Sequence, residues 1–294
     1  MPQTDPSHPE IESFFHKDSG TWTHVVHDGE AAAVIDPVLD YDAAAARTST
    51  TSADAVLAFV QQRALRVEWI LETHAHADHL SAAGYLQNGL DAPIAIGRGI
   101  VEVQAHFKQV FGLGDDFVAD GSQFDRLLDD GDEWTVGSLS VRTLATPGHT
   151  RDSLTYVVGD AAFIGDTLFA PDIGTARCDF PGGDAADLHA SIRRILALPE
   201  STRLFLCHDY PPPARASWRE TTIACEAKEN VQIGGGVGEA EFVAKRRARD
   251  ATLAVPRLLL PALQVNIRGG RLPPAEADGN HYLRLPLNRL GAKS

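Results

Sequence analysis

The sequence predicts an α/β protein built in layers, and two observations indicate this fold class. Short apolar segments typical of strands alternate with longer segments of helical periodicity in both halves of the first 210 residues. The chain has 294 residues, of which 44% are hydrophobic, so it can bury a sizeable core. These totals fit an ordinary globular protein with one large domain, or a domain with an appendage.

The elements of the first half follow from apolar runs and turn signals. Residues 1–12 are polar and contain prolines, so we expect a loose lead-in. Strands over 21–26 and 31–35 are separated by Asp28-Gly29, a strong hairpin signal. Residues 41–52 are expected to connect these strands to the next helix. The remaining expected elements are a helix over 53–65, a strand over 67–71, a helix over 79–87, a strand over 93–96, a helix over 101–111 and a long lid or rim loop over 112–130.

The second half continues the alternation up to a run of prolines. The elements expected before this run are two strands within 133–144, a hairpin of 153–158 and 161–164, a helix over 185–198 with Asp184 as N-cap, and a last core strand over 203–206. Three prolines after Tyr210 then stop the strand pattern. Helical segments over 218–228 and 239–253 and an extended tail over 256–288 follow. We therefore predict a metal-binding core over 13–210 and a C-terminal helical and extended segment over 211–294 that packs on it.

Composition also bears on partners and location. The net charge of −14 disfavours a nucleic-acid surface, and the basic cluster at 245–249 fits a solvated helix face. Three scattered cysteines are too few for a disulfide framework, which favours free thiols in a reducing compartment. The N-terminus shows no secretory signal, and no apolar run approaches the ~18 residues of a membrane span. The sequence therefore predicts a cytoplasmic protein with no membrane contact.

One stretch, residues 72–80, concentrates side chains that bind metal ions. It reads ETHAHADHL and contains three histidines and one aspartate directly after the predicted strand 67–71. In an extended backbone His74 and His76 point to the same side, so both can face one ion. Further candidate ligands follow three other predicted strands. The seven candidate ligands are His74, His76, Asp78, His79, His149, Asp166 and His208.

Spacing alone leaves two kinds of metal chemistry open. Seven ligands could hold two ions bridged by Asp166, which is the arrangement of binuclear hydrolases. A subset of two histidines and one carboxylate could instead form the facial triad of a non-haem Fe(II) enzyme that activates dioxygen. A third possibility is a metal-binding redox sensor without catalysis.

The motifs THAHADH, TPGHT and GDT, with His208 at a strand end, resemble the metallo-β-lactamase superfamily in order and spacing. The resemblance runs from about Thr21 to Tyr210. It implies an αββα sandwich of two mixed β-sheets with outer helices and metal at one edge. The segments 173–180, 208–210 and 264–270 are more similar to the persulfide dioxygenase branch than to the hydroxyacylglutathione hydrolases, also called glyoxalase II.

The resemblance to persulfide dioxygenases implies one Fe(II) per chain, held by His74, His149 and Asp166. The other four candidates, His76, Asp78, His79 and His208, would then hold the ligands by hydrogen bonds. Members of that branch oxidise glutathione persulfide with O2, giving glutathione and sulfite. A binuclear thioester hydrolase of the glyoxalase II type is the alternative. Family members are often dimers, and because this chain shows no rhodanese module, a sulfur-transfer partner would be a separate protein.

Glutathione would need cations and hydrogen-bond donors, and five residues are candidates for its site: Arg177, Tyr210, Asn266, Lys228 and Cys178. Arg177 could instead pair with Asp179 or Asp172, and Cys178 could be an inert, packed thiol. Relatives commonly place a basic residue where this chain has Ala227, and Lys228 is the candidate replacement. This departure leaves another low-molecular-weight persulfide open as the substrate.

Overall fold

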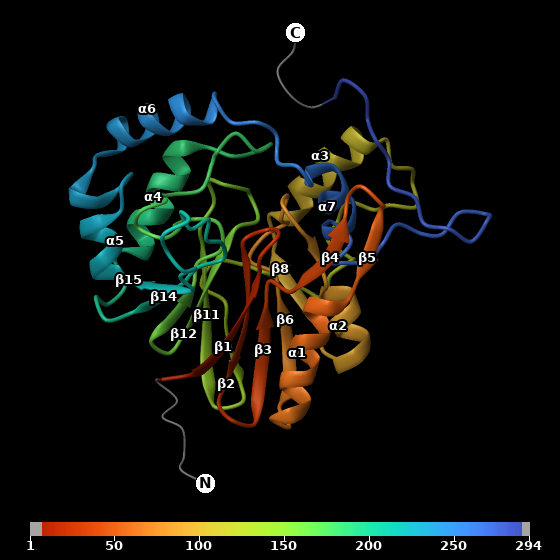
Figure 1. Cartoon of the computed structure of the whole chain (residues 1–294), viewed down its shortest axis with the longest axis horizontal. Helices are drawn as coiled ribbons and strands as arrows, with labels where there is room; N and C mark the ends of the chain where they lie inside the picture. Colours follow the sequence, from red (N-terminus) through yellow and green to blue (C-terminus); the bar gives the residue numbers. More distant parts are fainter. Residues whose placement is uncertain (1–7, 290–294) are drawn as a thin grey trace.

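The computed structural model describes residues 8–289 and shows two β-sheets face to face with helices on both outer sides (Figure 1). The first sheet has the strand order β1-β2-β3-β6-β8-β9. The second sheet has the order β10-β11-β12-β13-β14-β15. A small third sheet has the order β5-β4-β7. The strands are β1 (Glu10–His16), β2 (Thr21–His27), β3 (Ala31–Ile35), β4 (Val38–Asp42), β5 (Arg47–Ser49), β6 (Arg66–Leu71), β7 (Leu80–Ser81), β8 (Ile94–Gly97), β9 (Arg126–Leu128), β10 (Glu133–Val136), β11 (Leu139–Ala145), β12 (Leu154–Val158), β13 (Ala161–Phe163), β14 (Arg203–Phe205) and β15 (Glu220–Thr222).

Three apolar clusters separate the layers. One lies between the two sheets and joins residues such as Val26 and Leu71 to Val141 and Tyr156. The other two lie between each sheet and its own helices. The first sheet is covered by α1 (Thr51–Gln62), α2 (Ala83–Leu90), α3 (Ile100–Phe111) and α7 (Leu259–Asn266), and the second by α4 (Ala185–Ile195), α5 (Ile223–Glu229) and α6 (Glu239–Asp250). The predicted αββα sandwich is confirmed.

The second half folds largely as its local signals predict. Asp184 caps α4, because its Oδ1 atom accepts hydrogen bonds from the backbone N–H groups of Ala186 and Asp187 at 2.7 and 3.1 Å. The hairpins β10–β11 and β12–β13 pair in the expected antiparallel registers. The hairpins and the capped helix expected in this half are therefore present.

The structure differs from the sequence prediction in six regions. Of the expected lead-in over 1–12, residues 10–12 belong to β1, which pairs with β2 over its whole length, and residues 1–7 lie outside the described residues. The expected connection over 41–52 holds the end of β4 and all of β5, and the expected loop over 112–130 contains β9. The expected helix over 79–87 begins only at Ala83, after the short strand β7. The expected helical segment over 218–228 begins with β15, which pairs with β14, and α7 lies within the predicted extended tail.

Two of the strands and one helix that the sequence did not predict have weak local signals. β1 and β15 lie at sheet edges and contain polar residues such as Glu10, Glu12 and Glu220, so no apolar run marks them in the sequence. Helix α7 has only eight residues and carries Pro261 in its first turn, where the missing N–H group has no helical partner to lose. Tertiary packing, not local propensity, selects these elements.

Helix α5 carries a buried acid that should make stability depend on pH. Burial raises the pKa of Glu226 from 4.5 to about 7. The folded protein therefore holds this proton more tightly than the unfolded chain, so stability falls as pH rises from about 4.5 through about 7, by about 3 kcal/mol in all. We expect Glu226→Gln to be more stable than the wild type near pH ~8 and equally stable near pH ~5 in urea unfolding. The matched control is Glu229→Gln, an exposed position on the same helix, and a pH dependence that survives Glu226→Gln would contradict the assignment.

Candidate metal centre

The seven candidate ligands lie at one edge of the sandwich, each after the carboxyl end of a strand. The loop 72–80 follows β6, His149 follows β11, Asp166 follows β13 and His208 follows β14. Two of these strands, β13 and β14, are parallel neighbours, which brings Asp166 and His208 to the same edge. Gly148, at φ +136°, lets the turn before His149 approach α4 closely, since a Cβ atom there would lie 2.3 Å from the backbone nitrogen of Leu188.

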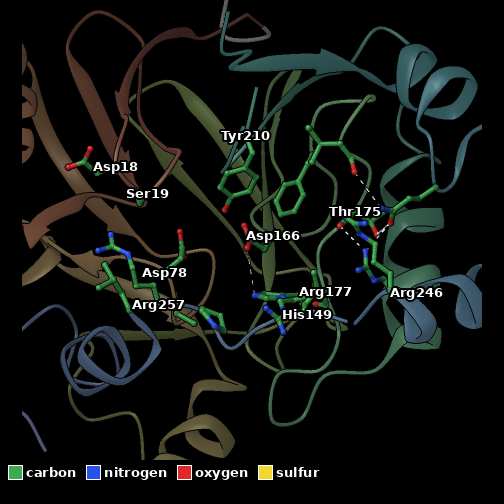
Figure 2. Close-up of a pocket in the computed structure, with 18 residues that line it drawn as sticks. Asp18, Ser19, Asp78, His149, Asp166, Thr175, Arg177, Tyr210, Arg246 and Arg257 are labelled. Atoms are coloured by element: carbon green, nitrogen blue, oxygen red, sulfur yellow. Dashed lines mark hydrogen bonds and ion pairs between the residues drawn. The ribbon is translucent and has the colours of Figure 1, made fainter. Parts of the chain in front are cut away.

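Three of the ligands, His74, His149 and Asp166, form a first cluster whose ligand atoms all lie within 4.8 Å of one another. The Oδ2 atom of Asp166 is 3.6 Å from Nε2 of His149 and 4.0 Å from Nε2 of His74. Figure 2 shows Asp166 and His149 together in the wall of a cavity, with Tyr210 beside Asp166. The first cluster therefore consists of two imidazoles and one carboxylate.

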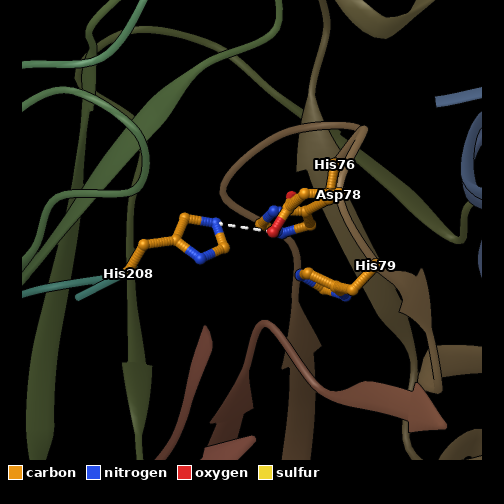
Figure 3. Close-up of side chains that lie close together, drawn as sticks. All are labelled: His76, Asp78, His79 and His208. Atoms are coloured by element: carbon orange, nitrogen blue, oxygen red, sulfur yellow. Dashed lines mark ion pairs between the residues drawn. The ribbon is translucent and has the colours of Figure 1, made fainter. Parts of the chain in front are cut away.

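The other four ligands, His76, Asp78, His79 and His208, form a second cluster of the same compactness. His208 approaches the loop residues from the opposite side (Figure 3). Its Nε2 atom lies 3.4 Å from Oδ2 of Asp78 and 3.3 Å from Oδ1 of Asp166. Asp166 therefore faces both clusters, one with each carboxylate oxygen.

The donor atoms that face these clusters fit a metal ion. Nitrogen and oxygen atoms of this edge are buried without a hydrogen-bond partner, namely His74 Nε2, His76 Nδ1, Asp78 Oδ2, His79 Nε2, Asp166 Oδ1 and His208 Nε2. So many buried polar atoms without partners would be costly in a protein that held no ion there. Burial, assisted by neighbouring imidazoles, lowers the pKa of His79 to about 3 and that of His74 well below its usual value. Neutral imidazole is the form that binds metal.

The opposite ring nitrogens are held by the protein, which fixes the tautomers. His149 donates from Nδ1 to the carbonyl oxygen of Arg177 at 2.7 Å, so its Nε2 lone pair faces Asp166. His79 donates from Nδ1 to the carbonyl oxygen of Leu80. His76 donates from Nε2 to the buried carboxylate of Asp36 at 3.0 Å, which leaves its Nδ1 atom free for a ligand role. Such outer partners orient metal-binding imidazoles.

Asp36 and Asn266 hold the loop 72–80 from two sides. The carboxylate of Asp36 also accepts hydrogen bonds from the backbone N–H and the hydroxyl group of Thr73, at 2.7 and 2.9 Å. From α7, the Asn266 amide donates to the carbonyl oxygens of His76 and His79, both at 2.8 Å, and accepts from the N–H group of Ser81. The C-terminal segment thus takes part in building the metal centre.

A cavity of about 390 Å³ opens onto the first cluster. Its wall contains His149 and Asp166, whereas His76, His79 and His208 of the second cluster do not line it. Its other side carries Arg249 and Arg257, which are exposed and have no ion-pair partner among residues 8–289. The cavity therefore joins a metal site to two free cations, which suits a substrate with one reactive end and an anionic body.

Comparison with known proteins identifies the family. The model of the metallo-beta-lactamase superfamily matches residues 17–208, which include all seven candidate ligands. The chain belongs to this superfamily. It is 53% identical over 293 residues to a probable metallo-hydrolase of Burkholderia pseudomallei, covering 95% of this chain and 99% of that protein. It is 50% identical to a beta-lactamase hydrolase-like protein of Xylella fastidiosa, covering 96% of this chain and 65% of the relative's length.

Persulfide dioxygenases are also among its relatives in the superfamily. The chain is 32% identical over 205 residues to the mitochondrial persulfide dioxygenase ETHE1 of Bos taurus, covering 68% of each chain. The crystal structure of ETHE1 from Myxococcus xanthus superposes with a TM-score of 0.70 and 29% identity, over 89% of this chain and all of that one. These likenesses support the persulfide dioxygenase branch of the superfamily.

The predicted substrate residues are only partly brought to the cavity of this superfamily member. Arg177 and Tyr210 line it. Arg177 is at the same time paired in two bonds with Asp179, at 2.5 and 2.7 Å, as its alternative interpretation predicted. Tyr210 stacks on the ring of His208 at 5.7 Å.

Asn266, Lys228 and Cys178 lie outside the cavity lining, which differs from their predicted role. Both N–H groups and the oxygen of the Asn266 side-chain amide already form hydrogen bonds with the backbone of residues 76–81, which we call the metal loop together with residues 72–75. Lys228 is exposed on α5 beside Glu229. Cys178 is buried, and burial raises its pKa to about 12, so it is a packed and unreactive thiol.

The cavity has a cationic rim, formed by Arg246, Arg249 and Arg257, which the sequence did not predict. Residues 245–249 were expected to form a solvated helix face. Arg246 is instead buried and donates two hydrogen bonds to Asp250, at 2.6 and 2.9 Å, and both Arg246 and Arg249 line the cavity. Arg257 lies in the segment that was expected to be extended. The pairing of Arg246 and Asp250 at i,i+4 is the one signal that could have placed this helix face inward.

Within residues 8–289, no helix is both long and apolar enough to cross a membrane.

Proposed function

We propose that this protein is a mononuclear Fe(II) persulfide dioxygenase that acts on a small anionic persulfide such as glutathione persulfide. His74, His149 and Asp166 would hold the iron, one per chain. An iron ion there would supply open coordination positions and redox chemistry for the reaction of the persulfide sulfur with O2 and water, giving sulfite and the thiol. The likeness to ETHE1 proteins in sequence and in structure supports this assignment.

The observation that carries the proposal is the position of the cavity. It is lined by His149 and Asp166 of the first cluster and by Asp78 of the second, whereas His74 and the three histidines of the second cluster do not line it. A substrate entering the cavity therefore meets the first cluster at His149 and Asp166, and a cluster of two imidazoles and one carboxylate leaves coordination positions open. This favours a supporting role for the second cluster.

The residues of the wall would bind and orient the substrate. Arg249 and Arg257 can pair with the carboxylates of a peptide thiol, and the Tyr210 hydroxyl, protonated at neutral pH, can donate a hydrogen bond. Phe169 packs edge-on to Tyr210 at 6.0 Å and, with Ile173, gives the wall an apolar part that excludes water. Holding the reactive end at one point converts the encounter into a unimolecular step.

A second candidate is a binuclear thioester hydrolase, and the intact second cluster favours it. Its four donor atoms converge as closely as those of the first, and Asp166 faces both. Two divalent ions held there would activate water for attack on an acyl group. The names of the relatives from Burkholderia pseudomallei and Xylella fastidiosa, a probable metallo-hydrolase and a hydrolase-like protein, are consistent with this alternative.

Metal content and reaction type separate the two candidates. We expect protein purified without oxygen to hold about one iron per chain. It should consume O2 when glutathione persulfide is added, and sulfite should appear. S-D-lactoylglutathione should not be cleaved. Two metals per chain with cleavage of this thioester and no uptake of O2 would establish the hydrolase instead. Iron without either reaction would favour a metal-binding redox sensor.

The proposed contacts of Arg249 and Arg257 lead to a prediction about substrate affinity. We expect Arg249→Gln and Arg257→Gln each to raise KM for glutathione persulfide about ten-fold, with little change in kcat, because each removes a charged partner of a carboxylate remote from the reacting sulfur. Steady-state O2 uptake measures both constants. Lys228→Gln is the matched control, since it removes a positive charge outside the cavity. A larger rise in KM for Lys228→Gln than for the rim variants would contradict this placement.

A further inference from the structure

A second cavity lies beneath the C-terminal segment, away from the metal centre. It has a volume of about 220 Å³ and is lined by the loop after α3, by α7 and by residues 273–284; we call it the tail cavity. Figure 1 shows this segment running beside α3 and α7. Two arginines line the tail cavity, Arg268 just after α7 and Arg284 near the end of the described chain. None of its lining residues contributes to the cavity at the metal centre.

The two arginines have no carboxylate partner in the fold. Within residues 8–289, no acidic oxygen lies within 4.0 Å of either guanidinium group. Arg268 is only 8% exposed, stacks over the ring of Phe117 at 4.6 Å, and donates a single side-chain hydrogen bond, to the carbonyl oxygen of Gln264. Arg284 donates from Nη1 to the carbonyl oxygens of Phe111 and Gly112. Among residues 8–289, these three hydrogen bonds engage few of the ten N–H donors of the pair, so donors remain for a ligand.

Electrostatics in the tail cavity agree with this geometry. Burial lowers the pKa of Arg268; Asp116 opposes this shift and the nearby charge of Arg284 adds to it. Two like charges that line one small space repel each other, and the buried Arg268 has little water around it to screen its charge. The carboxylates of Asp116 and Glu276 also line the cavity without reaching either guanidinium group. A bound anion would relieve the repulsion.

We propose that the tail cavity binds a small inorganic oxyanion, of the sulfate, sulfite or phosphate class, between Arg268 and Arg284. Guanidinium groups recognise such anions through paired N–H donors, and the cavity is smaller than the pockets that hold drug-sized ligands. The chain as a whole carries a net charge of −14, which repels anions, so binding requires a local site of this kind. The proposal does not depend on the reaction at the metal centre.

The bound anion would fasten the C-terminal segment to α7. Gln264, on α7, already forms two hydrogen bonds with the backbone of Arg284, at 2.7 and 3.0 Å. An anion between Arg284 and Arg268 would add a charged link at the same place. Opening of the segment 273–284 should then become rarer, because the anion binds only the closed form.

Hydrogen exchange of the full chain tests this site locally. Sodium sulfate, sulfite and phosphate are each added at constant ionic strength, and exchange of the segment 273–284 is followed by mass spectrometry. We expect at least one of these anions to slow exchange there and chloride to have no effect. Arg268→Gln and Arg284→Gln should each weaken the effect about ten-fold in anion concentration. The anion that acts at the lowest concentration identifies the preferred ligand.

Matched variants make the outcome decisive. Arg193→Gln removes an exposed charge on α4, which covers the second sheet and does not line the tail cavity, and should leave the effect of the anion unchanged. If Arg268→Gln does not fold, Arg284→Gln decides, because Arg284 is exposed and its replacement leaves the core intact. Absence of any anion effect in the folded wild type would overturn the proposal and indicate pairing with Asp116 or Glu276. An equal effect in the wild type and Arg284→Gln would also overturn it.

Discussion

Replacing Asp166 with alanine is expected to abolish metal binding and activity together. Its Oδ2 atom faces His149 and His74 at 3.6 and 4.0 Å, and its Oδ1 atom faces His208 at 3.3 Å, so among residues 8–289 it is the one carboxylate that faces histidines of both clusters. Removing a residue that only hydrogen-bonds to a metal ligand typically weakens metal binding roughly 10- to 100-fold, so removing a ligand itself should weaken it by more than this. Metal analysis after dialysis and O2 uptake measure the two effects.

The matched comparison for Asp166→Ala is His208→Ala. His208 is fully buried and belongs to the second cluster but not to the first. If one iron is bound by the first cluster, His208→Ala should retain most of the metal, while His149→Ala should lose it as Asp166→Ala does. Near-equal loss in all three variants would contradict the mononuclear site and support two ions. Circular dichroism of each variant shows whether the fold has survived.

The metal centre could be predicted from the sequence because its ligands follow strand ends. Strand termini are marked locally by apolar runs and by glycine or proline, so His149, Asp166 and His208 could each be assigned before their spatial neighbours were known. The structure brings them together with the loop after β6. The number and identity of the ions cannot be read in the same way, because both clusters converge on Asp166.

Residues that reach the site from a distance could not be predicted. Arg249 and Arg257 look like the solvated residues of a helix and a loop, and only the packing of α6 against α4 and of the following segment turns them to the cavity. Asn266 lies 190 residues from His76 in the chain, and the hydrogen bonds of its side-chain amide connect α7 to the metal loop. No local pattern encodes such contacts, since they depend on how the C-terminal segment packs on the core.

Asn266→Ala is therefore expected to destabilise the metal loop more than it affects substrate binding. The replacement leaves the carbonyl oxygens of His76 and His79 and the N–H group of Ser81 without partners in a buried place. Each such group costs about 1–3 kcal/mol, so the free energy of unfolding should fall by about 3 kcal/mol or more. Asn266→Asp should be nearly as harmful, because a carboxylate cannot donate to the two carbonyl groups.

Two measurements distinguish this role from the substrate contact that the sequence suggested for Asn266. Urea unfolding and metal retention should both fall for Asn266→Ala and Asn266→Asp, whereas a substrate contact would raise KM and leave stability unchanged. Asn280→Ala is the control, since Asn280 is exposed in the tail and its side-chain amide donates to Asp278, which is also in the tail. The Asn266 amide binds the carbonyl groups of His76 and His79, whose side chains are candidate ligands, so variants that lose stability should also lose metal. The C-terminal segment is in this way coupled to the metal centre of the core.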